Sequence, residues 1–390
     1  MSTINVDTIS DAAGSGKPNF PNGLTGDGSS LSGISAYKPI AVTGTTPSLD
    51  VGAYNFFHQS RITTSTAISF ASVPTDARWT YSYQAAFTSV YDLTAATGLI
   101  LKSFSVNAQE SQPQGMFFRD DGLKMYVIGD AVDNVSEYNL STAWDLDTAT
   151  YLQGYSVAAK DGNPYAVWFS SDGTQMYMLG RSSQAVHQYA LSTAWNVTTA
   201  SFTRTFSISS QTSTGNGMTF KDDGSIMYVL SQFPTKVFEY ALSTSYNIGT
   251  ASFTRSFDVG AQEGAPFGIR FKPDGLAMFI IGTSTDTVHE YTLSTAFNIS
   301  TASFTREYDF GGEEQPSDLF FKSDGSSIFI MGINDDIIRQ YNTSEVATLS
   351  VPSSVKNPPT LPYTPDNVIS YDFYTSDGGT NVYLIGESLT

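Results

Sequence analysis

The sequence repeats with a period of 51 residues, and this repeat limits the fold more than any other feature. An Asp-Gly dipeptide recurs at regular spacing and ends at Gly122, Gly173, Gly224, Gly275, Gly325 and Gly378. A tyrosine follows each of the first five glycines after 16 residues, at Tyr138, Tyr189, Tyr240, Tyr291 and Tyr341. Self-similarity at this period is typical of radial β architectures.

Each repeat contains the pattern of four short antiparallel strands. The Asp-Gly pair predicts a tight reversal between the first two strands, because glycine accepts the positive φ that such a hairpin needs. The flanking stretches, for example residues 115–118 and 125–128, are rich in aromatic and β-branched residues, as strands are. Apolar and polar residues alternate in the third strand, 135–140, so one of its faces is expected to be buried. Four such strands form one propeller blade.

Two incomplete repeats lie at the ends of this pattern. Gly378 has no tyrosine 16 residues later because the chain ends at Thr390, and Tyr91, in Val-Tyr-Asp-Leu-Thr, has no upstream Asp-Gly. We therefore expect a sixth blade with inner strands from residues 367–387 and outer strands from residues 87–106. The predicted fold is all-β, a six-bladed β-propeller of four-stranded blades with two-plus-two terminal closure. Such closure removes a free sheet edge.

Three regions are predicted: an extended attachment arm (1–36), a small β domain (37–85) and the propeller (86–390). The arm is dense in Gly, Ser, Asn, Asp and Pro and cannot form a core alone. We expect it to become ordered only on a particle or in an oligomer, through its apolar residues Ile4, Val6, Ile9, Phe20 and Leu24. Residues 67–74 and 79–83 have the composition of strands.

Composition excludes several classes of partner. The net charge is −18 with only 19 Lys and Arg residues, which argues against nucleic acid and anionic membrane surfaces, since both attract clustered positive charge. No apolar run is long enough to span a bilayer, and the first residues lack the features of a secretory signal. There is no cysteine, so no disulfide is expected, and cysteine usage does not indicate whether the protein occupies a reducing or an oxidising compartment.

The most variable segments are the loops that lead from the fourth strand to the next blade and from the second strand to the third. Both sets are expected on one face of the disc, where acidic residues gather. The candidate binding residues are Glu110, Asp130, Asp133, Asp161, Glu263, Asp286, Glu313, Glu314, Asp335 and Asp336. Hard cations take carboxylate oxygens, so Ca²⁺ is an alternative here. No metal-binding spacing supports it, and a solvated acidic face without a cofactor is the favoured interpretation.

A second recurring feature is an aromatic residue after Leu-Ser-Thr, at Trp144, Trp195, Tyr246 and Phe297. These residues could be stacking platforms for sugars, but a chain-wide repeat usually preserves packing positions, so packing beneath a loop is favoured. Arg204, Arg255 and Arg306, also 51 residues apart, are expected to be solvated or paired edge charges. No nucleophile elbow, phosphate loop or paired-carboxylate motif occurs, so no enzyme is expected.

Two motifs carry a resemblance to known proteins. The opening Ser-Thr-Ile-Asn-Val-Asp-Thr-Ile, followed by Gly-Lys-Pro-Asn-Phe-Pro-Asn-Gly-Leu, resembles the N-termini of virion structural proteins of marine tailed phages, tail-fibre-like proteins in particular. The repeat, with Met-Tyr-Val and then Tyr-x-Leu-Ser-Thr-Ala-Trp, is similar to propeller repeats in proteins of marine bacteria and phages. The resemblance implies a virion location, with the arm attached to the particle and the propeller displayed outward.

The expected function is that of a phage virion structural protein, a tail fibre or appendage that acts in host attachment or tail assembly. Expected partners are other virion proteins through the arm and a host surface glycan or protein, in a symmetric or homo-oligomeric assembly, with no nucleic acid and no membrane insertion. A capsid-decorating or portal-adjacent protein is the structural alternative. A propeller hydrolase or lactonase, with carboxylates and a metal at the channel mouth, is the enzymatic one.

Overall fold

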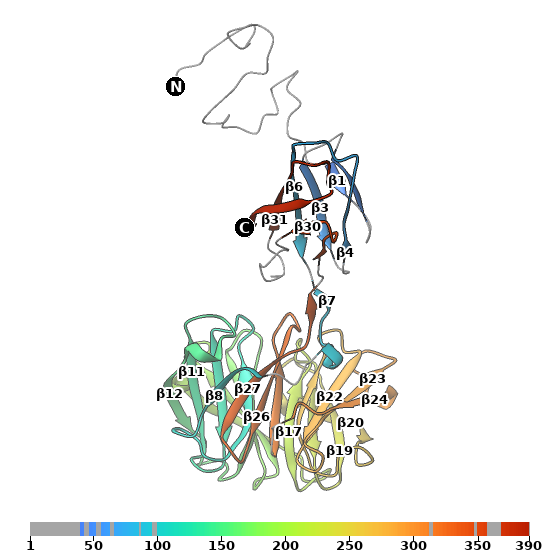
Figure 1. Cartoon of the computed structure of the whole chain (residues 1–390). Coiled ribbons are helices and arrows are strands. Elements are labelled where there is room, and N and C mark those ends of the chain that lie inside the picture. Colours follow the sequence, from blue (N-terminus) through green and yellow to red (C-terminus); the bar gives the residue numbers. More distant parts are fainter. Residues whose placement is uncertain are drawn as a thin grey trace, which may run out of the picture.

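The computed structural model describes residues 40–42, 47–51, 56–62, 66–85, 87–95, 100–311, 315–346, 349–356 and 368–389. The expected arm residues Ile4, Val6, Ile9, Phe20 and Leu24, and the acidic residues Glu313 and Glu314, lie outside these ranges. The described residues form a β-propeller and a smaller β domain joined by a narrow neck (Figure 1). The helices among them are short 3-10 turns: η1 (Leu93–Ala95), η2 (Leu146–Thr148), η3 (Val197–Thr199), η4 (Ile248–Thr250) and η5 (Ile299–Thr301).

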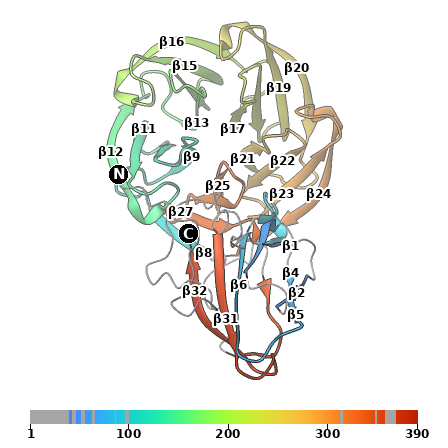
Figure 2. The ribbon, with the colours of Figure 1, turned by 90° about the horizontal axis from the view of Figure 1, so that it is seen from above.

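The propeller has five blades, each a four-stranded antiparallel sheet. The first blade contains β9 (Pro113–Phe118), β10 (Lys124–Gly129), β11 (Asn134–Leu140) and β12 (Ala149–Ser156). The next blades contain β13 (Pro164–Phe169), β14 (Gln175–Gly180), β15 (Ala185–Leu191) and β16 (Ala200–Ser207); β17 (Gly215–Phe220), β18 (Ile226–Ser231), β19 (Lys236–Leu242) and β20 (Ala251–Asp258); and β21 (Pro266–Phe271), β22 (Ala277–Gly282), β23 (Val288–Leu293) and β24 (Ala302–Tyr308). The innermost strands β9, β13, β17 and β21, with β25 of the last blade, form a closed ring of contacts (Figure 2).

The last blade closes the ring with one strand from the N-terminal side. It contains β25 (Pro316–Phe321), β26 (Ser327–Gly332), β27 (Ile337–Asn342) and β8 (Ile100–Ser105). Strand β8 pairs antiparallel with β27, from Ser105 opposite Ile337 to Ile100 opposite Tyr341. The prediction of six blades with two-plus-two closure is therefore wrong: there are five blades, and the closure is one-plus-three.

Tyr91 and Gly378 caused this error, because each has a different place from the one its motif predicted. Tyr91 has a φ of 55° and its ring packs against Gly325, which is how Trp144 packs against Gly122 in the first blade. It is thus the loop aromatic of the last blade and not a third-strand tyrosine. Gly378 forms the turn between β31 (Val368–Thr375) and β32 (Val382–Leu389), which lie outside the propeller.

The small β domain is built from both sides of the propeller sequence. Its main sheet has the order β1 (Ile40–Val42), β3 (Phe56–Ile62), β6 (Ala77–Ala85), β31, β32 and β30 (Val355–Lys356). Two parallel pairs lie beside it: β2 (Ser48–Asp50) with β5 (Ser69–Ala71), and β4 (Thr66–Ala67) with β29 (Leu349–Ser350). Its buried core includes Leu49, Phe57, Trp79, Tyr81, Tyr83, Ile369, Tyr371, Phe373 and Val382. Residues 349–356 and 368–389 therefore belong with this domain and not with the predicted propeller of 86–390.

The neck fixes which face of the propeller points away from the small domain. It consists of β7 (Phe87–Ser89) paired antiparallel with β28 (Glu345–Val346). Next to it, the Tyr91 amide donates to the Gly325 carbonyl (2.8 Å) and the Asp92 amide to the Thr343 carbonyl (3.0 Å). Gly325 belongs to an Asp-Gly turn, so the neck leaves the face that carries these turns, which we call the turn face. The opposite face, with the inter-blade loops and the second-to-third-strand loops, is the loop face, and it points away from the small domain (Figure 1).

The recurring aromatics are packing residues of the turn face. Trp144, Trp195, Tyr246 and Phe297 all have φ values of 60–65°, and each ring covers the Asp-Gly glycine of its own blade. The carbonyls of these loops also accept hydrogen bonds from the preceding blade, as from the Tyr126 hydroxyl to Trp195 (2.7 Å) and from the Tyr177 hydroxyl to Tyr246 (2.5 Å). The packing interpretation is therefore the one that the structure supports, because these aromatics join neighbouring blades.

An ion pair and two aromatic rings block the central channel. Arg270 and Asp318 are both buried, and an Arg270 guanidinium nitrogen lies 3.0 Å from an Asp318 oxygen. The guanidinium lies 5.3 Å from the ring centre of Trp168 and 5.2 Å from that of Phe320. Asp318 also accepts a hydrogen bond from the Met116 amide (2.9 Å), which joins the last blade to the first. The channel is therefore a packed core, and a ligand can reach only its mouths.

Candidate binding site at the channel mouth

Five β-bulges surround the channel mouth on the loop face. In the first blade Pro113 is opposite Gly129 and Gly115 opposite Ile128, so Gln114 is an extra residue without a partner in the ladder. The same register shift occurs in the other four inner strands. Bulges turn a side chain away from the regular pleat and are common beside binding sites. The five bulge residues are Gln114, Tyr165, Asn216, Phe267 and Ser317.

Aromatic rings from two blades meet at the mouth, and one arginine holds them. The rings of Tyr165 and Phe267 stack with centroids 6.1 Å apart and an interplanar angle of 22°. Arg181, which follows β14, donates to the Tyr165 hydroxyl (2.8 Å), and its guanidinium lies 4.8 Å from the centre of the same ring. Burial raises the pKa of Tyr165, although Arg181 opposes the shift. Arg181 also donates to the Gln232 side chain (3.2 Å), so three blades are connected at this point.

Amide side chains and one carboxylate complete the ring. Asp130 accepts from the Gln114 amide (3.3 Å) and from the Asn163 amide (3.2 Å). Asn216 donates to the Pro266 carbonyl (2.8 Å). The side-chain oxygens of Gln114 and Asn216 are buried and have no hydrogen-bond partner among the described residues. Unpaired buried acceptors are costly, so these two oxygens are places where a buried water molecule would be stabilised beneath the mouth.

The residues at the channel mouth differ from blade to blade, although other positions of the repeat keep the same residue. The bulge position holds Gln, Tyr, Asn, Phe and Ser in the five blades, and the position after the second strand holds Asp130, Arg181, Gln232, Thr283 and Ile333. The Asp-Gly glycine and the third-strand tyrosine are the same in all five blades. Packing alone would favour one residue type at symmetry-related positions. The mouth is therefore an asymmetric surface on a regular frame, as recognition loops are on rigid scaffolds.

Three of the predicted binding carboxylates hold the loops in place. Glu110 accepts from the amides of Gln112, Ala131 and Val132 (2.9, 3.1 and 3.3 Å). Asp161 does the same in the second blade, accepting from the amides of Asn163, Ser182 and Ser183, and Glu263 in the fourth, accepting from the amides of Ala265, Ser284 and Thr285. All three are buried and connect the loop that enters a blade to the second-to-third-strand loop. Their carboxylates therefore accept hydrogen bonds from backbone amides inside the protein and do not face a ligand.

The surroundings of Glu110 and Glu263 shift the pKa values of these two carboxylates in opposite directions. Burial raises the pKa of Glu110, and its three amide donors oppose the shift only in part. Burial also acts on Glu263, but the His289 imidazole, 3.7 Å away, and hydrogen bonds from Ser284, Thr285 and Ala265 outweigh it and bring its pKa down to about 2. Glu263 is therefore ionised at neutral pH.

The other predicted acidic residues lie in the second-to-third-strand loops. Asp133, Asp286 and Asp336 have φ values of 56–57°, a conformation that Asp tolerates better than most residues. Burial, together with Asp130 and Asp161, raises the pKa of Asp133. Asp336 accepts from Asn107, and Asp335 pairs with Arg339. Among the described candidates, only Asp130 lies at the channel mouth.

Sequence reasoning missed most of the mouth, namely Tyr165, Arg181, Gln232 and Phe267. Phe233, which is 60% exposed in the loop directly after Gln232, was missed as well. The signal was present in the repeat: aligned blade by blade, these positions vary, whereas the Asp-Gly glycine and the third-strand tyrosine do not. Choosing acidic residues could not find them, because the mouth is formed mainly by aromatic and amide side chains and one arginine.

The described residues contain neither a cluster of metal-ligating side chains nor a helix of membrane-spanning length. Across the described ranges, no group of three or more His, Cys, Asp or Glu side chains is placed to hold a metal ion. The 3-10 turns that make up the helices of this part of the chain are all too short to cross a membrane.

Comparison with known proteins gives similarities at low identity. No protein-family model matches the sequence, and no curated protein matches it. Among solved structures, the chain is similar to a protein of unknown function from Desulfotomaculum acetoxidans (10% identity, TM-score 0.38, 71% of this chain and 88% of that chain). It is also similar to a protein from Bacteroides uniformis described as a candidate 6-phosphogluconolactonase (12% identity, TM-score 0.39, 58% of this chain and 69% of that chain). A third similar structure is the periplasmic gluconolactonase of Pseudomonas aeruginosa (13% identity, TM-score 0.37, 70% of this chain and 69% of that chain). At these identities and TM-scores the similarity assigns no activity to this chain.

Proposed function

We propose that the protein is an attachment protein of a phage virion, a tail fibre or appendage that binds a host surface glycan with the loop face of its propeller. The observation that carries the proposal is the position of the neck. It leaves the turn face, so the variable channel mouth lies on the side remote from the small β domain. The phage-like N-terminal sequence precedes that domain in the chain. An adsorption protein needs this order, in which a segment for attachment to the particle comes before a domain whose variable face points away.

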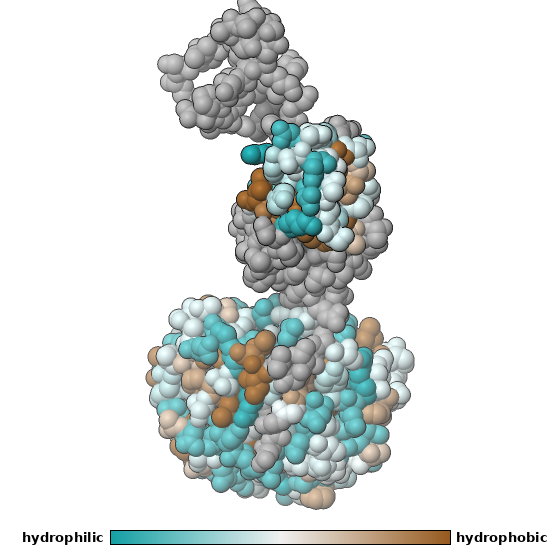
Figure 3. Space-filling model, in the orientation of Figure 1, coloured by the Kyte–Doolittle hydropathy of each residue, from teal (hydrophilic) through white to brown (hydrophobic). Residues whose placement is uncertain are grey.

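The side chains at the mouth favour a glycan over a polyanion or an apolar ligand. A sugar has C–H faces that stack on aromatic rings and hydroxyls that pair with planar amides and guanidinium groups. The mouth offers the half-buried Phe267, backed by the buried Tyr165, for stacking, and the half-buried Arg181 and Gln232 for hydrogen bonds. The side of the propeller seen in Figure 3 is mostly hydrophilic to neutral, with a few hydrophobic residues, and the net charge of −18 disfavours a polyanion.

A hydrolase is the competing function, since two of the similar structures carry lactonase names. Lactone hydrolysis needs a base that can activate water. The carboxylate at the mouth, Asp130, is engaged by the amides of Gln114 and Asn163. The described mouth residues therefore favour binding over turnover.

The test uses a particle that carries either the wild-type chain or the Tyr165→Ala/Arg181→Ala variant. Incorporation is checked by immunoblot and adsorption to host cells is timed. The proposal predicts normal incorporation with adsorption slowed at least tenfold. Unchanged adsorption would reject it and favour a capsid-decorating role, and hydrolysis of a sugar lactone by the purified chain, lost in the same variant, would favour the enzyme. Point variants are preferred to loop exchange, because Glu110 and Asp161 hold the loops in place.

A further inference from the structure

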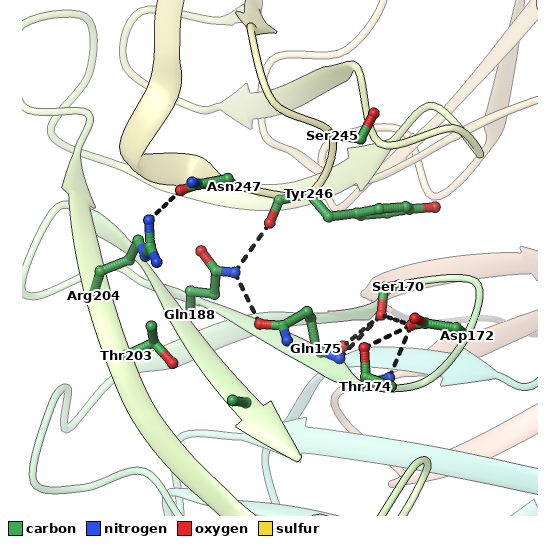
Figure 4. A pocket seen from close by; sticks show the side chains of 11 residues that line it. Ser170, Asp172, Thr174, Gln175, Gln188, Thr203, Arg204, Ser245, Tyr246 and Asn247 are labelled. Carbon is green, nitrogen blue, oxygen red and sulfur yellow. Dashed lines mark hydrogen bonds between the residues drawn. The ribbon is translucent and has the colours of Figure 1, made fainter. Parts of the chain in front are cut away.

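A cleft of about 390 Å³ lies between the second and third blades, on the turn face. Its walls include Ser170, Asp172 and Thr174 from the Asp-Gly turn of one blade and Ser245, Tyr246 and Asn247 from the loop of the next (Figure 4). Gln175 of β14, Gln188 of β15 and Arg204 of the outermost strand β16 also line it. The volume lies at the lower end of the range for small-molecule sites. In Figure 2 these two blades lie on the side of the ring opposite the small β domain.

The repeat shows why this junction is open. The residue before the Asp-Gly turn is basic in the other four blades, where Arg119, Lys221, Lys272 and Lys322 each pair with the turn aspartate. In the second blade this residue is Ser170, which donates to Asp172 (2.6 Å). A serine replaces a long side chain here, and the space that the long side chain would fill becomes part of the cleft.

The charges of this junction also differ from those of the other four. At the other junctions, the equivalent outer-strand residue meets a carboxylate: Arg255 with Glu239 (3.1 Å), Arg306 with Glu290 (2.9 Å), Gln153 with Glu137 (2.8 Å), and Lys102 with Asp147 (3.2 Å). Arg204 contacts the Asn247 amide oxygen, and no carboxylate of the described residues forms an ion pair with it.

Gln188 explains the missing carboxylate. It occupies the position of Glu239 and Glu290 and keeps their structural contact, since its oxygen accepts from the Ile248 amide (3.3 Å). Its nitrogen donates to Gln175 (2.9 Å) and to the Tyr246 carbonyl (3.0 Å). The glutamine thus preserves the packing between the blades but provides no negative charge for Arg204.

From these observations we infer that the cleft is a second ligand site, distinct from the channel mouth, and that it takes a small acidic sugar such as a uronic acid. Guanidinium groups bind carboxylates through paired, charge-assisted hydrogen bonds, and Arg204 is the blade-junction arginine that has no carboxylate partner among the described residues. The cleft is larger than a carboxylate alone requires. Ser170, Thr174, Thr203 and Gln175 supply hydroxyl and amide groups for the sugar hydroxyls. Asp172 is the acidic group in the wall, and its carboxylate is taken up by Ser170 and Thr174.

The test measures binding of D-glucuronate to the full chain by titration calorimetry, with D-glucose as the neutral comparison. Gln188→Glu gives Arg204 the partner that the other junctions have while keeping the contact to Ile248. We expect saturable glucuronate binding by the wild type, at least tenfold weaker binding by Gln188→Glu and by Arg204→Gln, and no comparable binding of glucose. Arg255→Gln, in the next junction, is the matched control and should bind like the wild type.

Three results would overturn the inference: no saturable binding of glucuronate by the wild type, undiminished binding by Gln188→Glu, or equal binding of glucose. The outcome is independent of the proposed attachment function. Tyr165→Ala/Arg181→Ala leaves the cleft intact and should bind glucuronate normally, whereas Gln188→Glu leaves the channel mouth intact and should not slow adsorption.

Discussion

The guanidinium of Arg270 lies 3.0 Å from the carboxylate of Asp318, with both side chains buried at the centre of the ring. Burial lowers the pKa of Arg270 and raises that of Asp318, and their mutual attraction opposes both shifts. The pair connects the last two blades, and Arg270 also donates to the Met116 carbonyl of the first (2.8 Å). The pair therefore helps to set how the ring closes.

Removing Arg270 should destabilise the propeller strongly. Arg270→Met leaves Asp318 buried without a counter-charge, which typically costs about 3–5 kcal/mol of unfolding free energy. Arg255→Met is the control, since its ion pair with Glu239 is partly exposed and should be worth about 1 kcal/mol or less. Urea denaturation would measure both. Equal losses of unfolding free energy in the two variants would show that the central ion pair contributes no more to stability than the partly exposed one.

The glycine under each loop aromatic should tolerate no side chain. Gly173 has a φ of 70°, and a Cβ there would overlap the ring of Trp195. Gly311 has a φ of 65° with nothing within 4 Å of the added Cβ. Gly311→Ala should cost about 1–2 kcal/mol for backbone conformation alone, and Gly173→Ala should cost about 1–3 kcal/mol more because of the overlap. Thermal unfolding followed by tryptophan fluorescence would compare them, and similar midpoints would refute the stacking role.

The stability of the propeller should fall in acid through Glu263. Its pKa is about 2 in the folded protein against 4.5 in the absence of structure, so the folded state favours the ionised form. This contribution is fully present above about pH 4.5 and is lost as the pH falls towards 2, on the order of 3 kcal/mol in total. Glu263→Gln should remove much of this dependence when unfolding free energy is measured from pH 5 to pH 2.5. An unchanged slope would contradict the assignment.

The repeat allowed the strands of a blade, their antiparallel order and the Asp-Gly turns to be predicted, because hairpin chemistry and alternation are local. The number of blades could not be predicted in this way. Tyr91 resembles the third-strand tyrosine in sequence, and only its packing on Gly325 shows that it is a loop aromatic. An Asp-Gly turn such as that at Gly378 indicates a hairpin but not the sheet to which it belongs.

The proposed binding surface lies on the face that the sequence predicted, but of its described residues only Asp130 was among the predicted candidates. Acidic residues such as Glu110 and Glu263 were chosen by charge. In the structure they are buried, and their carboxylates accept hydrogen bonds from loop amides. Tyr165 and Phe267 reach the mouth because a bulge redirects them, and a bulge depends on the register of two paired strands.

Truncation distinguishes the two domains. A chain ending at Val346 loses β31 and β32, so the small β domain should unfold while the propeller keeps all five blades. Its main thermal transition should stay within a few degrees of that of the full chain. Deleting residues 1–106 removes β8 and exposes the edge of β27, which should destabilise the propeller and promote aggregation. A propeller that collapses in the first chain and survives in the second would contradict the one-plus-three closure.

The most direct test of the central claim is the affinity of the purified full chain for envelope glycans of the host, measured by surface plasmon resonance for the wild type and for Tyr165→Ala/Arg181→Ala. If the channel mouth is the recognition site, the variant should fold normally and bind at least tenfold more weakly, while Arg255→Gln on the turn face binds like the wild type. Equal affinity of the wild type and the mouth variant would contradict the account.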